Sequence, residues 1–163
     1  MHILIKNKYL FFNQYKVKCA VGKRGIGLKK EEGDLITPKG SFKIKFIMFR
    51  KDRIKNLKTT IKKLPINKKL GWCDDPRSIK YNKLINYPFK LGSEKLYRKD
   101  NIYDLILVLN FNMNPIKINK GSAIFIHVAN KKFRPTKGCI ALKKSKLIEI
   151  IKYVKKNSIV KII

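Results

Sequence analysis

The stretch SAIFIHVANKKFRPTKGCIAL, residues 122–142, contains two apolar runs joined by a polar loop. His127 stands near the end of the first run, and Cys139 stands just ahead of the second. Because side chains of a strand point alternately to its two faces, this pattern places His127 on one face with Ala123 and Phe125. If the second run is a neighbouring strand, Cys139 could lie opposite His127, and the loop would bring the two side chains together.

This histidine and this cysteine have two interpretations. A cysteine reacts as its thiolate, and since a free thiol has a pKa of about 8.5, it needs a cationic or hydrogen-bonding neighbour to ionise at neutral pH. The imidazole of His127 could be that neighbour and serve as the general base. A single histidine at a strand end can equally be structural, and cysteine is among the residue types most often buried. The residues alone leave both interpretations open.

Gly138 immediately precedes Cys139. A residue without a Cβ lets a substrate carbonyl approach the backbone closely. The backbone amides of Gly138 and Cys139 are therefore our candidates for an oxyanion hole.

Outward from this stretch, the sequence predicts a mainly β domain with one amphipathic C-terminal helix. Residues 103–111 form a near-continuous apolar run, which is typical of a strand buried on both faces. A helix is predicted after Cys139, because apolar residues recur there with a spacing of three and four. The apolar residues of that helix are Leu147, Ile150, Ile151 and Val154. Further strands are predicted within residues 2–21, 41–49 and 158–163.

Two segments lack such periodicity. Residues 22–42 carry five glycines and a proline, so we expect mostly loop there. Residues 50–100 are irregular and rich in lysine, proline and turn residues. We expect this second segment to be an insertion or a lid.

Composition limits the classes of protein to consider. At 163 residues, the chain is long enough for one domain with a genuine core, which we place at 1–163. An apolar fraction of 44% argues against disorder. The formal net charge of +30 comes mostly from scattered lysines, which either reflect a bias of the whole chain or attract polyanions non-specifically. Because arginine, the usual reader of bases and phosphates, is scarce, we expect no specific nucleic-acid recognition.

Other classes are excluded by missing patterns. Cys19, Cys73 and Cys139 are too widely separated for a Cys-x-x-Cys metal site, and two histidines add no ligand spacing, so we expect no metal or cofactor. No apolar run approaches the roughly 18 to 20 residues of a membrane span. The apolar stretches at the N-terminus are broken by lysines, so no signal peptide is visible and a cytoplasmic location is one alternative.

Residues 121–142 resemble the active-site segment of the YkuD-type L,D-transpeptidases. The family pattern is a histidine, a loop, and then Ser or Thr, any residue, Gly and Cys, which here reads His127 followed by Thr136, Lys137, Gly138 and Cys139. Residues 20–44, 71–85 and 94–109 resemble other segments of the same family, so the likeness covers almost the whole chain.

One position departs from the family pattern. Many members carry arginine two residues after the cysteine, where this chain has Ala141. We expect that change to affect substrate preference more than chemistry.

The resemblance implies a β-sandwich-like domain that acts on peptidoglycan stem peptides without a cofactor. Cys139 would attack the carbonyl on the L-centre of the third residue and form a thioacyl intermediate. His127 would act as base and then as acid, oriented by a backbone carbonyl for which Val128 is our candidate. Periplasm or cell envelope would be the location, and a monomer is the default.

Three functions remain in competition. The first is L,D-transpeptidation, and the second is the same chemistry with water as acceptor, which gives an L,D-carboxypeptidase. The third is a basic polyanion-binding module in which the histidine and the cysteine are inert. The sequence does not separate the first two, because the acceptor decides between them.

Four further side chains are candidates for substrate binding. Trp72 lies in a segment that reads as a turn, and it either serves that turn or lines the substrate cleft. Arg98 could bind a substrate carboxylate or pair with a nearby aspartate. Arg134, with its neighbour Lys137, could lower the pKa of Cys139 or hold an acidic peptide. Thr136 belongs to the motif itself. We expect Cys139 to be the one cysteine with a depressed pKa.

Overall fold

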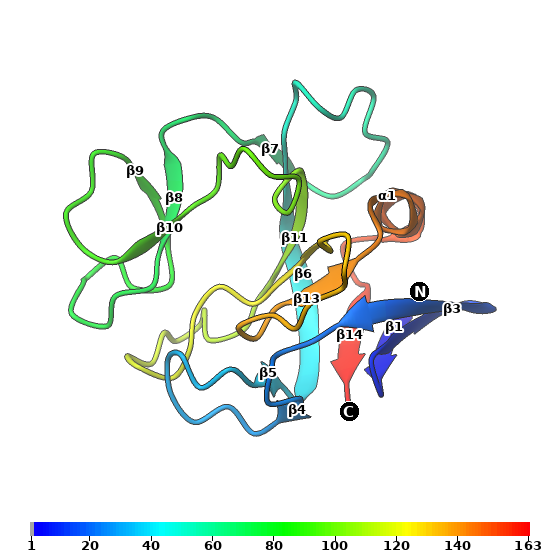
Figure 1. Cartoon of the computed structure of the whole chain (residues 1–163), viewed down its shortest axis with the longest axis horizontal. Coiled ribbons are helices and arrows are strands. Elements are labelled where there is room, and N and C mark those ends of the chain that lie inside the picture. Colours follow the sequence, from blue (N-terminus) through cyan, green and yellow to red (C-terminus); the bar gives the residue numbers. More distant parts are fainter. Residues whose placement is uncertain (1) are drawn as a thin grey trace.

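The computed structural model describes residues 2–163, and they form a mainly β structure with one short helix (Figure 1). The helix is α1 (Lys144–Tyr153). The strands are β1 (His2–Lys6), β2 (Tyr9–Phe12), β3 (Tyr15–Ala20), β4 (Ile26–Gly27), β5 (Thr37–Pro38), β6 (Gly40–Phe49), β7 (Lys63–Pro65), β8 (Leu70–Cys73), β9 (Leu84–Asn86), β10 (Ser93–Lys95), β11 (Leu105–Leu109), β12 (Phe125–Val128), β13 (Ile140–Leu142) and β14 (Ile159–Ile162).

The main sheet closes on itself, so the expected β-sandwich is corrected to a closed barrel. Its strands follow the order β11-β12-β13-β3-β2-β1-β14-β6-β7, and β11 also pairs with β6. The closure depends on β6, whose start at residues 40–43 pairs with β14 and whose remainder pairs with β11. Barrels and sandwiches show the same alternation of inward and outward side chains, so the sequence pattern could not distinguish them.

Strand β11 is buried on both faces, as its unbroken apolar run predicted. Leu105, Leu107 and Leu109 belong to the cluster inside the barrel. Ile106 and Val108 point outward into a second cluster. All five are fully buried, and β11 is therefore shared between two cores.

Strand β12 confirms the predicted alternation around the histidine. Ile126 and Val128 face the inside of the barrel. Phe125 joins the second cluster on the outer side. His127, two residues on, therefore projects from the outer face of the barrel wall.

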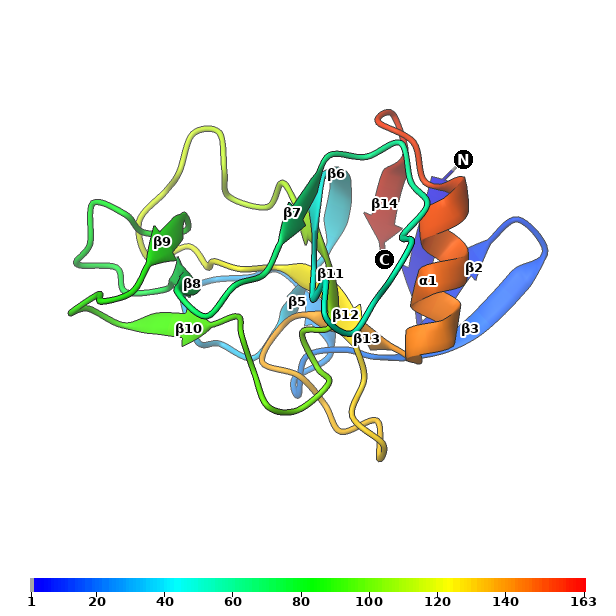
Figure 2. The ribbon, with the colours of Figure 1, turned by 90° about the horizontal axis from the view of Figure 1, so that it is seen from above.

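The predicted C-terminal helix is present. Leu147, Ile150 and Ile151 are buried and complete the inner cluster of the barrel. Figure 2 shows α1 along one side of the barrel, at the opposite side from the small sheet of β8, β9 and β10.

The 50–100 segment is more ordered than predicted. It contains β7 and a three-stranded sheet of order β10-β8-β9. Trp72 and Cys73 lie in β8, so the expected turn at this point is wrong. Leu70, Trp72 and Leu96 of this segment pack in the second cluster against the outward side chains of β11 and β12. The segment is thus a fixed layer on the barrel, and nothing in its packing marks it as a lid.

A buried carboxylate joins this segment to the rest of the molecule. Asp104 is 1% exposed and accepts ion pairs from Arg53 at 2.8 Å and from Lys144 of α1 at 2.8 Å. The 50–100 segment, the start of β11 and the helix therefore meet at one side chain.

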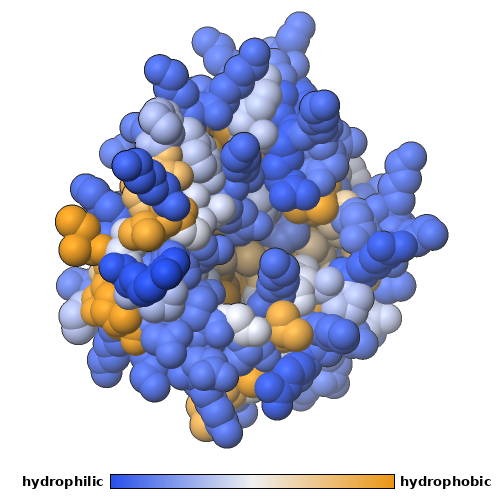
Figure 3. Space-filling view, turned by 60° about the vertical axis from the view of Figure 1, so that its left-hand side comes forward, coloured by the Kyte–Doolittle hydropathy of each residue, from blue (hydrophilic) through white to orange (hydrophobic). Residues whose placement is uncertain are grey.

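The surface agrees with the composition. Figure 3 shows a face that is mainly hydrophilic, with only separate apolar patches. Within residues 2–163, the structure contains no helix long and apolar enough to cross a membrane.

Candidate active site

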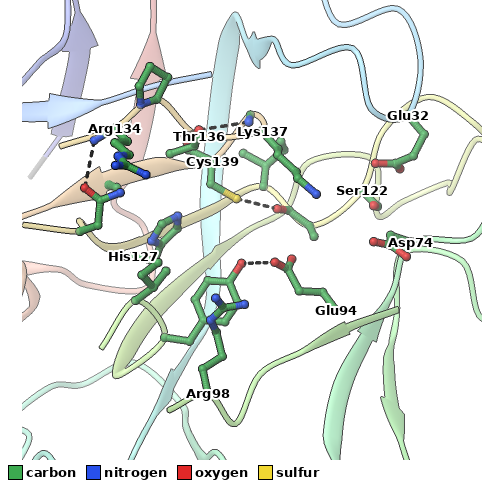
Figure 4. A pocket seen from close by; sticks show the side chains of 18 of the residues that line it. Glu32, Asp74, Glu94, Arg98, Ser122, His127, Arg134, Thr136, Lys137 and Cys139 are labelled. Atoms are coloured by element: carbon green, nitrogen blue, oxygen red, sulfur yellow. Dashed lines mark hydrogen bonds between the residues drawn. The ribbon is translucent and has the colours of Figure 1, made fainter. Parts of the chain in front are cut away.

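A pocket of about 400 Å³ lies where β12 and the start of β13 meet the 50–100 segment and the loop between β4 and β5. Both His127 and Cys139 line it (Figure 4). Arg98, Arg134 and Thr136 line it as well. The structure therefore brings the two reactive side chains and three of the four predicted binding residues into one cavity.

The register of the two strands fixes how the pair is arranged. β12 and β13 are parallel, and His127 is the register partner of Ala141. Cys139 directly precedes β13, so it lies diagonally ahead of the histidine rather than opposite it. Ala141 is thus the residue beside His127 and also lines the pocket.

The imidazole of His127 is held in one orientation. Its Nδ1 lies 2.9 Å from the carbonyl oxygen of Val128. Because a carbonyl only accepts hydrogen bonds, Nδ1 must carry the proton, which leaves Nε2 as the free lone pair. Burial lowers the pKa of His127 to about 4 and outweighs the raising effect of the Val128 bond. The ring is therefore neutral at pH 7 and able to accept a proton.

The thiol of Cys139 is also held. Its Sγ donates to the carbonyl of Ala123 at 3.0 Å, and the amide of Phe125 lies 3.4 Å from the same sulfur. Ala123 has a φ of +48°, which is uncommon for a residue with a side chain. The resting thiol thus keeps its proton and donates its hydrogen bond to a backbone carbonyl rather than to His127.

The depressed pKa expected for Cys139 is wrong for this state of the protein. Burial raises the pKa of Cys139 to about 12, and the negative charge of Glu94 acts in the same direction. The opposing cation is Lys29, not the predicted Arg134 or Lys137. The pair therefore rests as a neutral thiol and a neutral imidazole. Burial also raises the pKa of Cys19 to about 12.

The loop ahead of Cys139 is folded around Thr136. The Thr136 hydroxyl donates to the carbonyl of Cys139 at 2.5 Å and accepts from the amide of Gly138 at 3.1 Å. The Gly138 amide is therefore engaged, which corrects its expected place in an oxyanion hole. The Thr136 hydroxyl shapes this loop and has no free donor left for substrate.

Gly138 is required here for its backbone. Its φ is +145°, and a Cβ on it would lie 3.0 Å from the carbonyl oxygen of Ile36. Its own carbonyl accepts a hydrogen bond at 2.8 Å from the fully buried Thr37 hydroxyl. The start of β5 thus supports the segment that carries the cysteine.

Trp72 is not part of this pocket, so its predicted role in substrate binding is corrected. The indole is 2% exposed and packs edge-on against Phe125 at 5.2 Å. Its Nε1 donates to Asn82 at 3.1 Å. It supports the pocket wall from behind.

Two predicted arginines do line the pocket. Arg98 pairs with Asp100 at 2.6 Å, so the ion pair expected as the alternative is present. Arg134 is exposed, and its backbone amide donates to the side chain of Asn130 at 3.0 Å. Both arginines line the cavity, but their contacts do not identify which ligand they would bind.

Sequence reasoning missed several residues of this pocket. Tyr103 packs edge-on against His127 with ring centroids 5.3 Å apart, and its hydroxyl donates to Glu94 at 2.6 Å. Other missed residues include Lys29, Glu32, Asp74, Ser122 and Ala123. They come from separate segments with no common spacing, so only the three-dimensional arrangement reveals them. Within residues 2–163, no three His, Cys, Asp or Glu side chains are grouped so that they could hold a metal ion.

The chain was compared with models of known protein families and with curated proteins. The family model YkuD, described as the L,D-transpeptidase catalytic domain, matches residues 3–162. A search among curated proteins finds no match.

Proposed function

This chain belongs to the YkuD family of L,D-transpeptidase catalytic domains, and from that premise we propose that it is a cysteine acyltransferase that cross-links or remodels peptidoglycan stem peptides. We place this activity in one catalytic domain, residues 1–163. The observation that carries the proposal is that Cys139 shares one pocket with an imidazole whose Nε2 lone pair is left free. Family membership alone supports only L,D-transpeptidase-type activity on peptidoglycan in general.

The first step would acylate the cysteine. The thiol gives up its hydrogen bond to the Ala123 carbonyl, and its proton passes from sulfur to Nε2 of His127 as the sulfur attacks the carbonyl carbon of the third stem residue. The C–N bond to the terminal D-amino acid then breaks, and the imidazolium returns the proton to the leaving amine. A thioester on Cys139 and a free D-amino acid result.

The second step would release the acyl group. An amine of a neighbouring stem attacks the thioester, its proton passes to Nε2 of His127, and the thiolate leaves and is reprotonated. A neutral thiol and imidazole suit this cycle, because each of the two steps begins and ends with an uncharged imidazole and with the sulfur as a thiol or a thioester. The Cys139 amide is our remaining candidate for the oxyanion donor.

The experiment is incubation of the protein with purified muropeptides, with the products identified by mass spectrometry. Cross-linked dimers that are absent with Cys139→Ala support the proposal. Shortened stems without dimers would assign the carboxypeptidase alternative. No product from wild type would leave the polyanion-binding module as the better account.

The substrate sets the proposed place of action. Peptidoglycan stems are found in the cell envelope, so we propose that the protein works there. Fractionation of cells with an antibody against this chain tests the location, and a signal confined to the cytoplasmic fraction would contradict it.

A further inference from the structure

Acidic side chains are scarce in this chain and yet gather in the pocket. The sequence has 10 Asp and Glu residues against 40 Lys and Arg residues. Glu32, Asp74 and Glu94 all line the cavity that contains Cys139. Figure 4 shows Glu32 and Asp74 on one side of the pocket and His127 on the other, with Cys139 between them.

Two of these carboxylates have no cation of their own. Among the ion pairs of residues 2–163, none involves Glu32 or Asp74. Lys29 also lines the pocket, but its ammonium group is bound to Asp34 at 2.6 Å. Burial and the charge of Glu32 raise the pKa of Asp74 and outweigh the opposing charge of Lys137, which forms no ion pair with it. Two neighbouring carboxylates that repel each other would be stabilised by a bound cation.

The hydroxyl group of Ser122, in the same corner of the pocket, also lacks a hydrogen-bond partner. This observation does not depend on the carboxylates. The Ser122 hydroxyl is buried, lines the pocket and makes no hydrogen bond. Figure 4 shows it between Glu32 and Asp74. The nearby Tyr81 hydroxyl donates to Glu32 at 2.5 Å and accepts from the Gly121 amide at 3.0 Å, and no hydrogen bond joins it to the Ser122 hydroxyl. A buried hydroxyl left unpaired is costly, so a ligand is expected to meet it.

The three groups match one ligand chemistry. The two carboxylates and the hydroxyl oxygen are three acceptor groups, and a primary ammonium ion carries three N–H donors. A metal ion fits less well, because within residues 2–163 no three acidic, histidine or cysteine side chains converge closely enough to hold one. Lys137 also lines the pocket, but it is exposed and forms none of the ion pairs of the described residues.

We propose that the corner formed by Glu32, Asp74 and Ser122 binds the side-chain ammonium group of the donor stem's third residue, the residue whose carbonyl Cys139 attacks. This inference rests on the proposed function. Because the corner lies on the side of Cys139 away from His127, an amine held there stays protonated and positions the donor without reacting. The acceptor amine must instead approach where His127 can take its proton. The acidic corner therefore separates the amine that anchors from the amine that reacts.

The test compares two synthetic tetrapeptide stems in calorimetric binding to the Cys139→Ala protein. Both have lysine at the third position and D-alanine at the fourth, and in one of them the lysine Nε is acetylated. We expect the free amine to bind about tenfold tighter, which corresponds to about 1.4 kcal/mol. Asp74→Asn and Ser122→Ala should each reduce this preference. Glu31→Gln removes an exposed neighbouring carboxylate that does not line the pocket, and it should leave the preference unchanged.

Equal affinity for the two peptides would overturn the inference, as would a preference that survives both Asp74→Asn and Ser122→Ala. Thermal melts identify a variant that fails to fold, and the other variant then decides. The proposed function is read separately, from acylation of wild-type Cys139 by either peptide. Acylation without a preference for the free amine would reject the acidic corner alone, whereas a preference without acylation would reject the acyl transfer alone.

Discussion

The two walls of the pocket are built in different ways. The wall that carries His127 and Cys139 consists of β12 and the start of β13, which are neighbours in one hydrogen-bonded ladder of the barrel. The facing wall, with Asp74 and Glu94, comes from the small sheet and loops of the 50–100 segment. Backbone pairing positions the first wall, whereas side-chain contacts such as Tyr103 with Glu94 hold the second.

The walls also differ in charge. Burial keeps the thiol and the imidazole neutral on the barrel side. The opposite side concentrates carboxylates on a chain of net charge +30. The difference suggests that the barrel wall supplies reactivity and the facing wall supplies recognition. The predictions below test this division, beginning with the largest effect.

Removing the sulfur should abolish chemistry without disturbing the barrel. Cys139→Ala is expected to lower acyl transfer by a factor of about 10⁴ or more, since the nucleophile is lost. Circular dichroism and thermal melting should match wild type, because the side chain is only partly buried and precedes β13. Transfer at the normal rate in Cys139→Ala would show that the barrel wall is not the reactive one.

The neutral histidine should appear in the pH dependence of stability. Its folded pKa of about 4 lies below the ordinary 6.5, so between these values the unfolded chain binds a proton that the folded protein does not. Stability should therefore fall by about 3 kcal/mol as pH drops from 7 to 4, and no further below that. Urea unfolding of wild type and His127→Gln measures this component, which the variant should lack. An identical pH profile for both proteins would mean that His127 is not buried as a neutral ring.

The junction between the walls should depend on Asp104. Asp104→Asn removes both ion pairs, with Arg53 and with Lys144. Because the carboxylate is buried but both partners are partly exposed, we expect a loss of about 2 kcal/mol in the free energy of unfolding. Chemical denaturation measures it. A variant as stable as wild type would show that the 50–100 segment is held by its apolar cluster alone.

The smallest effect is expected behind the facing wall. Trp72→Phe keeps an aromatic ring against Phe125 and loses the hydrogen bond to Asn82. We expect a stability loss of about 1 kcal/mol and an unchanged KM for stem peptides. A raised KM with unchanged stability would return Trp72 to the substrate cleft.

The sequence predicted features that depend on one strand, and it missed features that depend on contacts between distant segments. Alternation in β12 correctly placed His127 on the same face as Phe125, because period two is a local property of one strand. The apolar run of β11 likewise predicted a strand buried on both faces. Closure into a barrel was missed, because it depends on β6 pairing with strands far away in the chain.

The ionisation of the pair was missed for a related reason. Charged neighbours in sequence suggested a thiolate at Cys139, but burial dominates its pKa, and burial is set by the whole fold. Trp72 was misplaced because Asp74, Asp75 and Pro76 read as a turn, while the preceding residues pair with β9 and β10. The acidic corner joins residues 32, 74 and 122, which no sequence spacing connects.

The most direct test of the central claim is mass spectrometry of the acylated enzyme. Wild-type protein is mixed with a tetrapeptide stem that ends in D-alanine, quenched in acid, digested and mapped. The account predicts a mass gain equal to the peptide without its D-alanine, on Cys139 alone and absent from His127→Ala quenched at the same early time. An adduct on Cys19 or Cys73 instead, or release of D-alanine with Cys139 unmodified at every time point, would contradict it.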